Sequence, residues 1–292
     1  MSHYTPVTLK TKRGKVLNAF EGDAITLEIQ RKGEYDTNIL NSLSEVLAVI
    51  KPEVSLDIGA NIGNHALIIA DFSKRLIAFE PVDFIYQILK TNLNQNHAVQ
   101  VEAVNVALSD REGQAEIFIP DNANLGSSSL ENFSGSGRRL EINSLIGDQF
   151  LAQHYVGQVD FIKMDVEGHE VPALTGLEET IKTHQPLLLL EYNNKTTMDG
   201  FQDKELFTGL FAGYTVFSIM TANSKKIHGQ GIVGFFKRIY YKYFAKNWVL
   251  SSFNPNLRYS NIYLVPARYM PFFEQFCFMP AYDTTHQKQA GK

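Results

Sequence analysis

The stretch that decides the fold runs Val54-Ser-Leu-Asp-Ile-Gly-Ala-Asn-Ile-Gly63 and places a short apolar strand directly before a glycine-containing turn. Glycine at the end of a strand lets the backbone turn sharply and approach a ligand closely. The helix expected over residues 64–72 points its first N–H groups into the same crevice. Because ligands in open α/β sheets bind at the carboxyl ends of the strands, residues 57–63 predict a ligand site.

Outward from this turn, apolar strands alternate with amphipathic helices, which predicts a doubly wound, Rossmann-like α/β sheet. A small N-terminal β region precedes it, and two antiparallel strands close it, with a helical insertion before the last strand. Strands are expected at 7–9, 16–17, 24–29, 54–57, 75–80, 99–107, 160–165, 186–191, 214–219 and 261–265, and helices at 36–50, 64–72, 83–94 and 172–182. Asp83 is the expected N-cap of the helix at 83–94.

The same pattern divides the chain into four parts. Residues 1–50 form N-terminal strands and a helix, and residues 51–220 form the ligand-binding core. Residues 221–260 form an aromatic and basic insertion, and residues 261–292 form the last strand and a polar tail.

The glycine pattern also discriminates between ligands. A dinucleotide fingerprint reads G-x-G-x-x-G and places a diphosphate on the helix, whereas this turn reads D-x-G-x-x-x-G. The carboxylate of Asp57 would repel a diphosphate but not a ligand that carries an amine and a sulfonium. Glu80 ends the next strand, where an acid can accept hydrogen bonds from both ribose hydroxyls. We therefore expect S-adenosylmethionine; the alternatives are a nicotinamide dinucleotide and an ordinary βα turn with an exposed acid.

Five stretches together resemble the FkbM-type methyltransferases, over roughly residues 30–220. They are Val54-Ser-Leu-Asp-Ile-Gly-Ala-Asn-Ile-Gly-Asn64, Ala78-Phe-Glu-Pro81, Val106-Ala-Leu-Ser-Asp110, Phe161-Ile-Lys-Met-Asp-Val-Glu-Gly-His-Glu170 and Pro186-Leu-Leu-Leu-Leu-Glu-Tyr192. The resemblance implies a class I methyltransferase fold and O-methylation of a hydroxyl on a sugar, a glycan or a natural product. Residues 141–146 lack an Asp that the family commonly has, and residues 221–260 match no family pattern.

The resemblance also implies roles for individual residues. Cofactor contacts are implied for the residues at the strand ends: Asp57, Gly59, Asn61 and Gly63 on the methionine and ribose part, Glu80 on the ribose diol, Asn105 to Ala107 around the adenine, and Asp165 at the methionine end. Glu34, Tyr35 and Asp36 precede the first long helix, where the family often has a Gly-x-Tyr-Glu string. One of these carboxylates would face the cofactor, or Asp36 would cap the helix.

Methyl transfer to an alcohol benefits from a base that removes the hydroxyl proton. Asp165, His169 and Glu191 follow strands that end at the same crevice, so they are the catalytic candidates. His169 has a suitable ordinary pKa near neutrality, although it could instead face solvent. Glu191 ends an apolar strand, so we expect its pKa to be raised by burial.

A metal site is an alternative for the same carboxylates. Asp165, Glu167, Glu191 and Asn193 are oxygen ligands of the kind that Mg²⁺ or Ca²⁺ prefers. Their spacing is not diagnostic, so the prediction includes no metal ligand, and dependence on a divalent metal stays open.

Residues 234–248, within the segment 232–248, separate into two faces on a helical wheel. Phe235, Phe236, Ile239, Tyr240, Tyr243, Phe244 and Trp248 share one face, and Lys237, Arg238, Tyr241, Lys242 and Lys246 share the other. The segment is read as a lid over the core, as a helix on an anionic membrane surface, or as a surface for nucleic acid. The remainder of the chain is acidic, which argues against nucleic acid.

The sequence thus predicts a methyltransferase that acts on a small-molecule or glycan acceptor held under the insertion. The rival functions are N-methylation of an amine and a non-catalytic, membrane-associated cofactor-binding protein. The single Cys277 and the lack of a secretory signal predict a cytoplasmic protein. Peripheral contact with the inner membrane surface through 232–248 is the alternative, and the oligomeric state is open.

Overall fold

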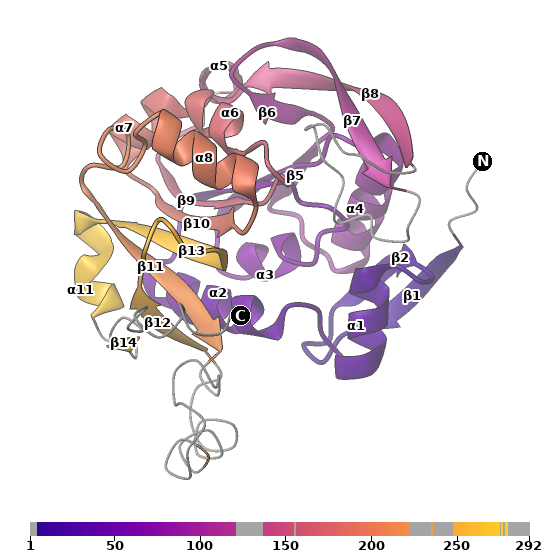
Figure 1. The fold of residues 1–292 in the computed structure, drawn as a ribbon. Coiled ribbons are helices and arrows are strands. Elements are labelled where there is room, and N and C mark those ends of the chain that lie inside the picture. Colours follow the sequence, from indigo (N-terminus) through magenta and orange to yellow (C-terminus); the bar gives the residue numbers. More distant parts are fainter. Residues whose placement is uncertain are drawn as a thin grey trace, which may run out of the picture.

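The computed structural model describes residues 5–120, 137–154, 156–221, 235, 248–274, 276 and 278–279 of the 292-residue chain. A mixed sheet runs through the centre of the molecule (Figure 1). Within the described residues it has nine strands, in the order β14 (Phe278–Met279), β12 (Trp248–Ser252), β11 (Tyr214–Thr221), β13 (Tyr259–Pro266), β10 (Leu187–Tyr192), β9 (Val159–Met164), β3 (Val54–Ile58), β4 (Arg75–Phe79) and β5 (Val101–Val104). The strands from β10 to β5 are parallel, and β13 joins them antiparallel.

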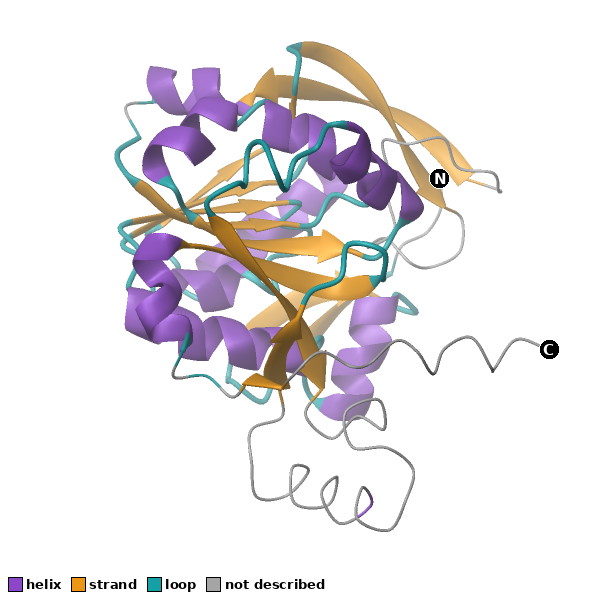
Figure 2. Ribbon diagram, turned by 60° about the vertical axis from the view of Figure 1, so that its left-hand side comes forward, coloured by secondary structure: helices purple, strands orange, loops and turns teal. Residues whose placement is uncertain are grey.

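Helices cover both faces of this sheet (Figure 2). On one face lie α1 (Ala24–Lys32), α2 (Thr37–Ile50), α3 (Ala66–Ala70) and α4 (Asp83–Gln95), and on the other lie α5 (Gly147–Gln153), α6 (Glu170–Thr175), α7 (Glu178–His184) and α8 (Lys195–Asp203). Side chains alternate between the two cores with the period of a strand. In β10, Leu187 and Leu189 pack toward α2 and α3, and Leu188 and Leu190 pack toward α6 and α7. The predicted doubly wound fold is confirmed.

Smaller elements surround the sheet. The N-terminal hairpin pairs β1 (Pro6–Lys10) with β2 (Val16–Phe20), and a second sheet has the order β6 (Ala107–Ser109), β8 (Gly137–Ile146) and β7 (Gly113–Pro120). After β13 come η2 (Ala267–Tyr269) and α11 (Met270–Phe273).

The strand predicted at 99–107 is wrong as a single unit, because it is divided between β5 and β6 in different sheets. The Asn105 side chain donates to the carbonyls of Glu80 and Pro81 at 2.9 and 3.0 Å. These two hydrogen bonds form where the chain leaves the main sheet, between β5 and β6.

The strand predicted at 24–29 is wrong, since these residues begin helix α1. The Asp23 carboxylate caps the helix by accepting from the Ile25 N–H, and Gly33 ends it in the left-handed conformation with φ 78°. Ile25 and Ile29 lie four residues apart and both are buried, which is helical spacing. Apolar and polar residues alternate over residues 25–29, which is the pattern of a strand, but Leu27 is exposed and Thr26 is buried.

Two helix boundaries also differ from the prediction. Residues 172–182 do not form one helix, because α6 ends at Thr175 and α7 begins at Glu178. The break contains Gly176, where an added Cβ would lie 2.0 Å from the Ser109 carbonyl oxygen, so the backbone of β6 passes too close for a side chain. Asp83 is not the N-cap of α4; Val82 holds that position and Asp83 lies in the first turn.

The closing strands β11 and β13 pair antiparallel as predicted. Residues 222–234 and 236–247 lie outside the described residues, and with them most of the aromatic and basic helix that the sequence predicts. The sequence places Trp248 on the predicted helix, which is wrong, because Trp248 begins β12. Its indole N–H donates to Glu45 at 3.1 Å. Within the described part of the chain, no helix combines the length and apolarity needed to cross a bilayer.

Candidate functional site

The turn after β3 brings three strand ends together. Gly59 has φ 80°, and a Cβ on it would lie 1.9 Å from the carbonyl oxygen of Asp165. Its N–H and that of Ala60 both donate to the Phe79 carbonyl at the end of β4, at 3.0 and 2.9 Å. Only glycine allows β9 to approach the turn this closely. The crevice therefore lies where β3, β4 and β9 end side by side.

Glu80 follows β4 and holds this turn from the side. One carboxylate oxygen accepts from the Asn61 N–H and the other from the Val82 N–H, each at 2.9 Å. The side chain is buried, and burial raises the pKa of Glu80 to about 7 although both N–H donors act in the other direction. Glu80 therefore links the glycine turn to the start of α4.

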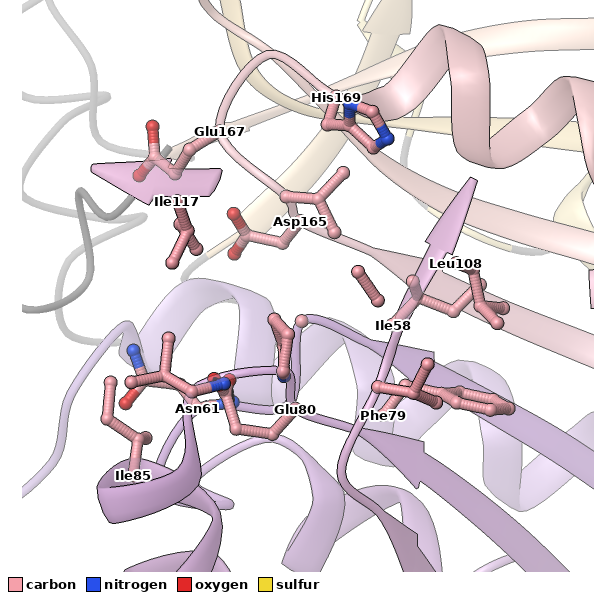
Figure 3. A pocket seen from close by; sticks show the side chains of 16 residues that line it. Ile58, Asn61, Phe79, Glu80, Ile85, Leu108, Ile117, Asp165, Glu167 and His169 are labelled. Carbon is pink, nitrogen blue, oxygen red and sulfur yellow. Dashed lines mark hydrogen bonds between the residues drawn. The ribbon is translucent and has the colours of Figure 1, made fainter. Parts of the chain in front are cut away.

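An apolar cavity of about 580 Å³ opens beside Glu80 (Figure 3). Its walls are Ile58, Gly59, Asn61, Phe79, Glu80, Pro81, Val82, Ile85, Val106, Ala107, Leu108, Ile117, Asp165, Val166, Glu167 and His169. The predicted site residues Gly59, Asn61, Glu80, Ala107, Asp165 and His169 thus meet around one cavity. Gly63 and Asn105 stand outside its lining.

His169 lies at the wall of the apolar cavity (Figure 3). Its Nε2 is hydrogen-bonded to the Ser109 hydroxyl at 3.0 Å. Burial lowers the pKa of His169 to about 4, with Arg111 acting in the same direction, so the imidazole is neutral at physiological pH. A group with that pKa is a weak base, and the structure therefore does not favour the predicted role as general base.

Asp57, a predicted cofactor contact, lies behind the two cavities rather than in their walls. Its carboxylate is fully buried and lines neither cavity; its Oδ1 lies 3.4 Å from the Lys163 ammonium, on the neighbouring residue of β9. Lys163 also lies 3.4 Å from Asp165 and donates to the Gly59 carbonyl at 3.3 Å. Burial acts to lower the pKa of Lys163, but Asp57 and Asp165 together raise it, so the ammonium stays charged.

A second cavity, of about 710 Å³, adjoins the first and is acidic. The two cavities share Gly59, Asn61, Asp165 and Glu167. The walls of the acidic cavity are Ala24, Ile25, Tyr35, Gly59, Ala60, Asn61, Ile62, Asn64, His65, Lys163, Asp165, Glu167 and Glu191. Helix α1 and the segment before α2 thus close a cavity whose floor is made by strand ends far along the chain.

Three carboxylates converge in the acidic cavity. Oxygens of Asp165, Glu167 and Glu191 all lie within 4.8 Å of one another. Leu190 of β10 pairs with Met164 of β9, so the next residues, Glu191 and Asp165, emerge side by side. The side chains of Glu191 and Asp165 point to the face of the sheet that also carries Asp57 and Lys163, because side chains alternate along a strand.

Crowding of negative charge sets the ionisation of this cluster. Burial, and then Asp165, raises the pKa of Glu191 to about 11, so Glu191 carries a proton at neutral pH; the predicted rise is confirmed in direction. Burial and Asp165 also raise the pKa of Glu167, to about 7. Burial acts to raise the pKa of Asp165, but Lys163 and His65 bring it below its ordinary value. Asp165 is therefore the ionised member, and Glu167 titrates near neutrality.

The Glu34-Tyr35-Asp36 string contributes its aromatic residue rather than a carboxylate. Glu34 is ion-paired with Arg13 at 2.7 Å, away from both cavities. Asp36 occupies the N-cap position of α2 without a side-chain capping bond, and lies 3.6 Å from His65 Nε2. Only Tyr35 lines the acidic cavity.

Sequence reasoning missed several residues of the site. Glu167 lines both cavities, although the predicted catalytic and cofactor-binding residues do not include it; Tyr35, Lys163 and Ile117 also contribute walls. Lys163 carried a usable signal, because it shares the face of Asp165 at a spacing of two. Ile117 carried none, since its strand reaches the cavity only through the fold of the second sheet.

The fold and this crevice define a class I methyltransferase: the strand order reverses between β3 and β9, and both cavities open beside that reversal. The family model of the FkbM methyltransferase domain matches residues 57–215. The chain belongs to the FkbM methyltransferase family.

Two curated relatives match part of the chain. The AMB antimetabolite synthetase AmbE of Pseudomonas aeruginosa is 26% identical over 185 residues, covering 50% of this chain and 9% of AmbE. The hexuronic acid methyltransferase AglP of Haloferax volcanii is 27% identical over 131 residues, covering 45% of this chain and 52% of AglP. The matches therefore span at most about half the length of either relative.

A solved FkbM methyltransferase from Methylobacillus flagellatus superposes with a TM-score of 0.44 and 17% identity, covering 73% of this chain and 44% of that one.

Proposed function

We propose that the protein transfers a methyl group from S-adenosylmethionine to a hydroxyl of a sugar, a glycan or a natural product. The observation that carries the proposal is the pairing of two cavities of opposite character at one strand edge. An apolar cavity beside Glu80 suits a nucleoside, and the adjoining carboxylates suit a positively charged sulfur. A diphosphate would meet Glu80, Asp165 and Glu167 at this edge, and all three would oppose its charge.

The residues present fit the cofactor. Ile58, Val82 and Ile117 offer apolar surface to an adenine ring, and the Glu80 carboxylate lies where it would accept from ribose hydroxyls. The backbone at Gly59 leaves room that any side chain would fill. Asp165 and Glu167 line both cavities, so they would face the point at which the two halves of the cofactor meet.

When bound, S-adenosylmethionine supplies an electrophilic methyl group on a cationic sulfur. The acceptor oxygen would form a bond to the methyl carbon as the carbon–sulfur bond breaks, which would release neutral S-adenosylhomocysteine, and the hydroxyl proton must go to a base. We assign that base to Glu167, whose pKa near 7 suits proton transfer at neutrality. Asp165 is held ionised by Lys163 and is the weaker base; Glu191, already protonated, would donate its hydrogen bond to Asp165.

A divalent cation would be a second way to balance the three carboxylates. We propose that it is not required, because Lys163 and the proton on Glu191 already lower the negative charge of the cluster. In that case the residues of the cluster bind and orient the acceptor directly.

The acceptor is proposed to enter beside Tyr35. Thr221, the last described residue before the insertion, accepts a hydrogen bond from the Asn38 side chain at 2.8 Å. Thr221 therefore lies beside Asn38, which is three residues after Tyr35 in the chain, and Tyr35 lines the acidic cavity. The name of AglP, a hexuronic acid methyltransferase, supports a sugar acceptor.

Two measurements test the proposal in sequence. Calorimetric titration should show binding of S-adenosylmethionine and S-adenosylhomocysteine, and weaker or no binding of NAD. Incubation with methyl-labelled cofactor and fractionated cell extract should then label a sugar-containing product, with mass spectrometry placing the methyl group on oxygen. Label on nitrogen would favour the N-methyltransferase rival. Tight cofactor binding without transfer to any fraction would favour the non-catalytic one.

A further inference from the structure

The turn that carries Asp165 and Glu167 has an unfavourable backbone. Between β9 and α6, Glu167 has φ 50° and Gly168 has φ 100°. The left-handed region is uncommon for a residue with a side chain, and such a conformation persists only where neighbouring groups hold it. The orientation of the Glu167 carboxylate therefore depends on whatever fixes this turn.

Glu170 fixes it from within. The side chain is fully buried, and its two oxygens accept from the Val166 N–H at 3.2 Å and from the Gly168 N–H at 3.0 Å. These N–H groups stand on either side of Glu167. One buried carboxylate thus binds the backbone before and after the residue in the left-handed conformation.

Thr197 of α8 completes the arrangement. Its hydroxyl donates to the Glu170 oxygen that also accepts from Gly168, and its side chain is fully buried. Its own N–H donates to the Asn194 side chain at 2.8 Å, which caps α8 directly after β10. Helix α8 also packs closely on α6, since a Cβ at Gly200 would lie 2.9 Å from Val171. The turn after β9 is thereby tied to the helix after β10.

We propose that Glu170 and Thr197 form a positioning clamp for the reaction, acting through the 165–168 turn on Asp165 and Glu167. The clamp joins the two strand ends whose carboxylates meet in the acidic cavity. Neither clamp residue lines the apolar or the acidic cavity, so neither would touch a cofactor or acceptor held there. The inference rests on the proposed function, because it assigns Asp165 and Glu167 to the cationic end of the cofactor.

The two forms of the cofactor provide a specific readout. S-adenosylmethionine carries a positive sulfur and S-adenosylhomocysteine a neutral one, whereas the nucleoside is the same. Loss of the clamp moves the carboxylates and should weaken binding of the charged form selectively. A general loss of structure would weaken both forms alike.

The experiment compares Thr197→Val with Thr197→Ser and with Thr180→Val. Thr180 of α7 is a matched control, because it is also a buried threonine whose hydroxyl donates to a carboxylate, that of Asp148, at 2.6 Å. Thr180 lines neither cavity. Calorimetry on the full chain gives the affinity for both cofactor forms, and denaturant unfolding gives stability. We expect Thr197→Val to weaken binding of S-adenosylmethionine about tenfold and of S-adenosylhomocysteine less than about threefold, because one hydrogen bond to the buried Glu170 carboxyl group is lost.

Thr197→Ser keeps the hydroxyl and should restore both affinities, and Glu170→Gln should repeat the Thr197→Val pattern if it folds. Thr180→Val should lose stability with both affinities unchanged. Equal weakening of the two forms by Thr197→Val, or no weakening, overturns the clamp. If the unaltered protein binds neither form, the proposed function itself fails, which is a separate result.

Discussion

The apolar and acidic cavities share four residues but are assembled in different ways. The apolar cavity draws most of its walls from residues 58–117, in consecutive strands and turns. The acidic cavity combines residues 24–35, 59–65 and 163–191, which are distant in the chain. The lining of the first is mostly apolar and includes the acids Glu80, Asp165 and Glu167, whereas the lining of the second exposes mainly polar and charged groups.

Burial and the crowding of negative charge raise carboxyl pKa values separately in the two parts of this crevice. Glu80 has its pKa raised mainly by burial, because its closest partners are N–H groups. Burial also acts first on Glu191, but neighbouring carboxylates add to it and carry its pKa to about 11. A ligand with an apolar nucleoside at one end and a positive charge at the other matches both environments.

The largest expected effect is on the stability of the fold rather than on ligand binding. Asp57→Ala should lower the free energy of unfolding by about 3 kcal/mol or more, because it removes a fully buried partner from the Lys163 ammonium. Denaturant unfolding measures this. The control is Asp71→Ala, which breaks the partly exposed pair with Lys15 and should cost less than about 1 kcal/mol. Equal small losses would show that the buried pair is not structural.

The next effect belongs to the apolar cavity. Glu80→Ala should weaken both forms of the cofactor about 100-fold, because two bonds from ribose hydroxyls to a carboxylate would be lost. Glu80→Gln should lie between this variant and the unaltered protein. Glu53→Ala, at an exposed acid paired with Lys74, should leave calorimetric affinity unchanged. Unaltered binding by Glu80→Ala would remove the ribose assignment.

The pH dependence of methyl transfer tests the acidic cavity. The raised pKa of Glu167 means that its carboxyl is protonated below about pH 7 and can accept a proton only above it. The rate should therefore rise about tenfold between pH 6 and pH 8 and then level off. Glu167→Gln should lower kcat and abolish this rise. A profile that keeps its midpoint in Glu167→Gln would assign the base elsewhere.

A smaller effect concerns the apolar wall. Ile117→Ala should weaken both forms of the cofactor about fivefold, since it removes apolar area without touching charge. The equality of the two losses distinguishes this wall from the acidic cavity. Val99→Ala, at a side chain 93% exposed, is the control and should change neither affinity. A loss confined to the charged form would contradict the division between the cavities.

Removal of divalent cations should have the smallest effect. Treatment with a chelator followed by buffer exchange is expected to change the rate of methyl transfer by less than about twofold, because the proposed reaction requires no divalent cation. Restoration of a lost rate by Mg²⁺ would instead assign Asp165, Glu167 and Glu191 to a metal.

Periodic and short-range features were predictable from the sequence. The apolar strands, the glycine turn and Glu80 depend on local spacing, so the doubly wound sheet and much of the apolar cavity followed from it. Helix α1 was misread because the capping residue Asp23 and Gly33 outweigh a β-rich composition. Trp248 was misread because a strand partner, β11, decides its conformation.

The sequence alone places acids at or directly after the ends of β3, β4, β9 and β10, at one edge of a parallel sheet, because strand period and turn chemistry are local. Only the tertiary structure decided the partner, the protonation and the position of each acid. Register and burial directed Asp57 to Lys163, left Glu191 protonated and placed Glu167 at the junction of the two cavities. These outcomes depend on distances between charges and on exclusion of water, which exist only once the chain has folded.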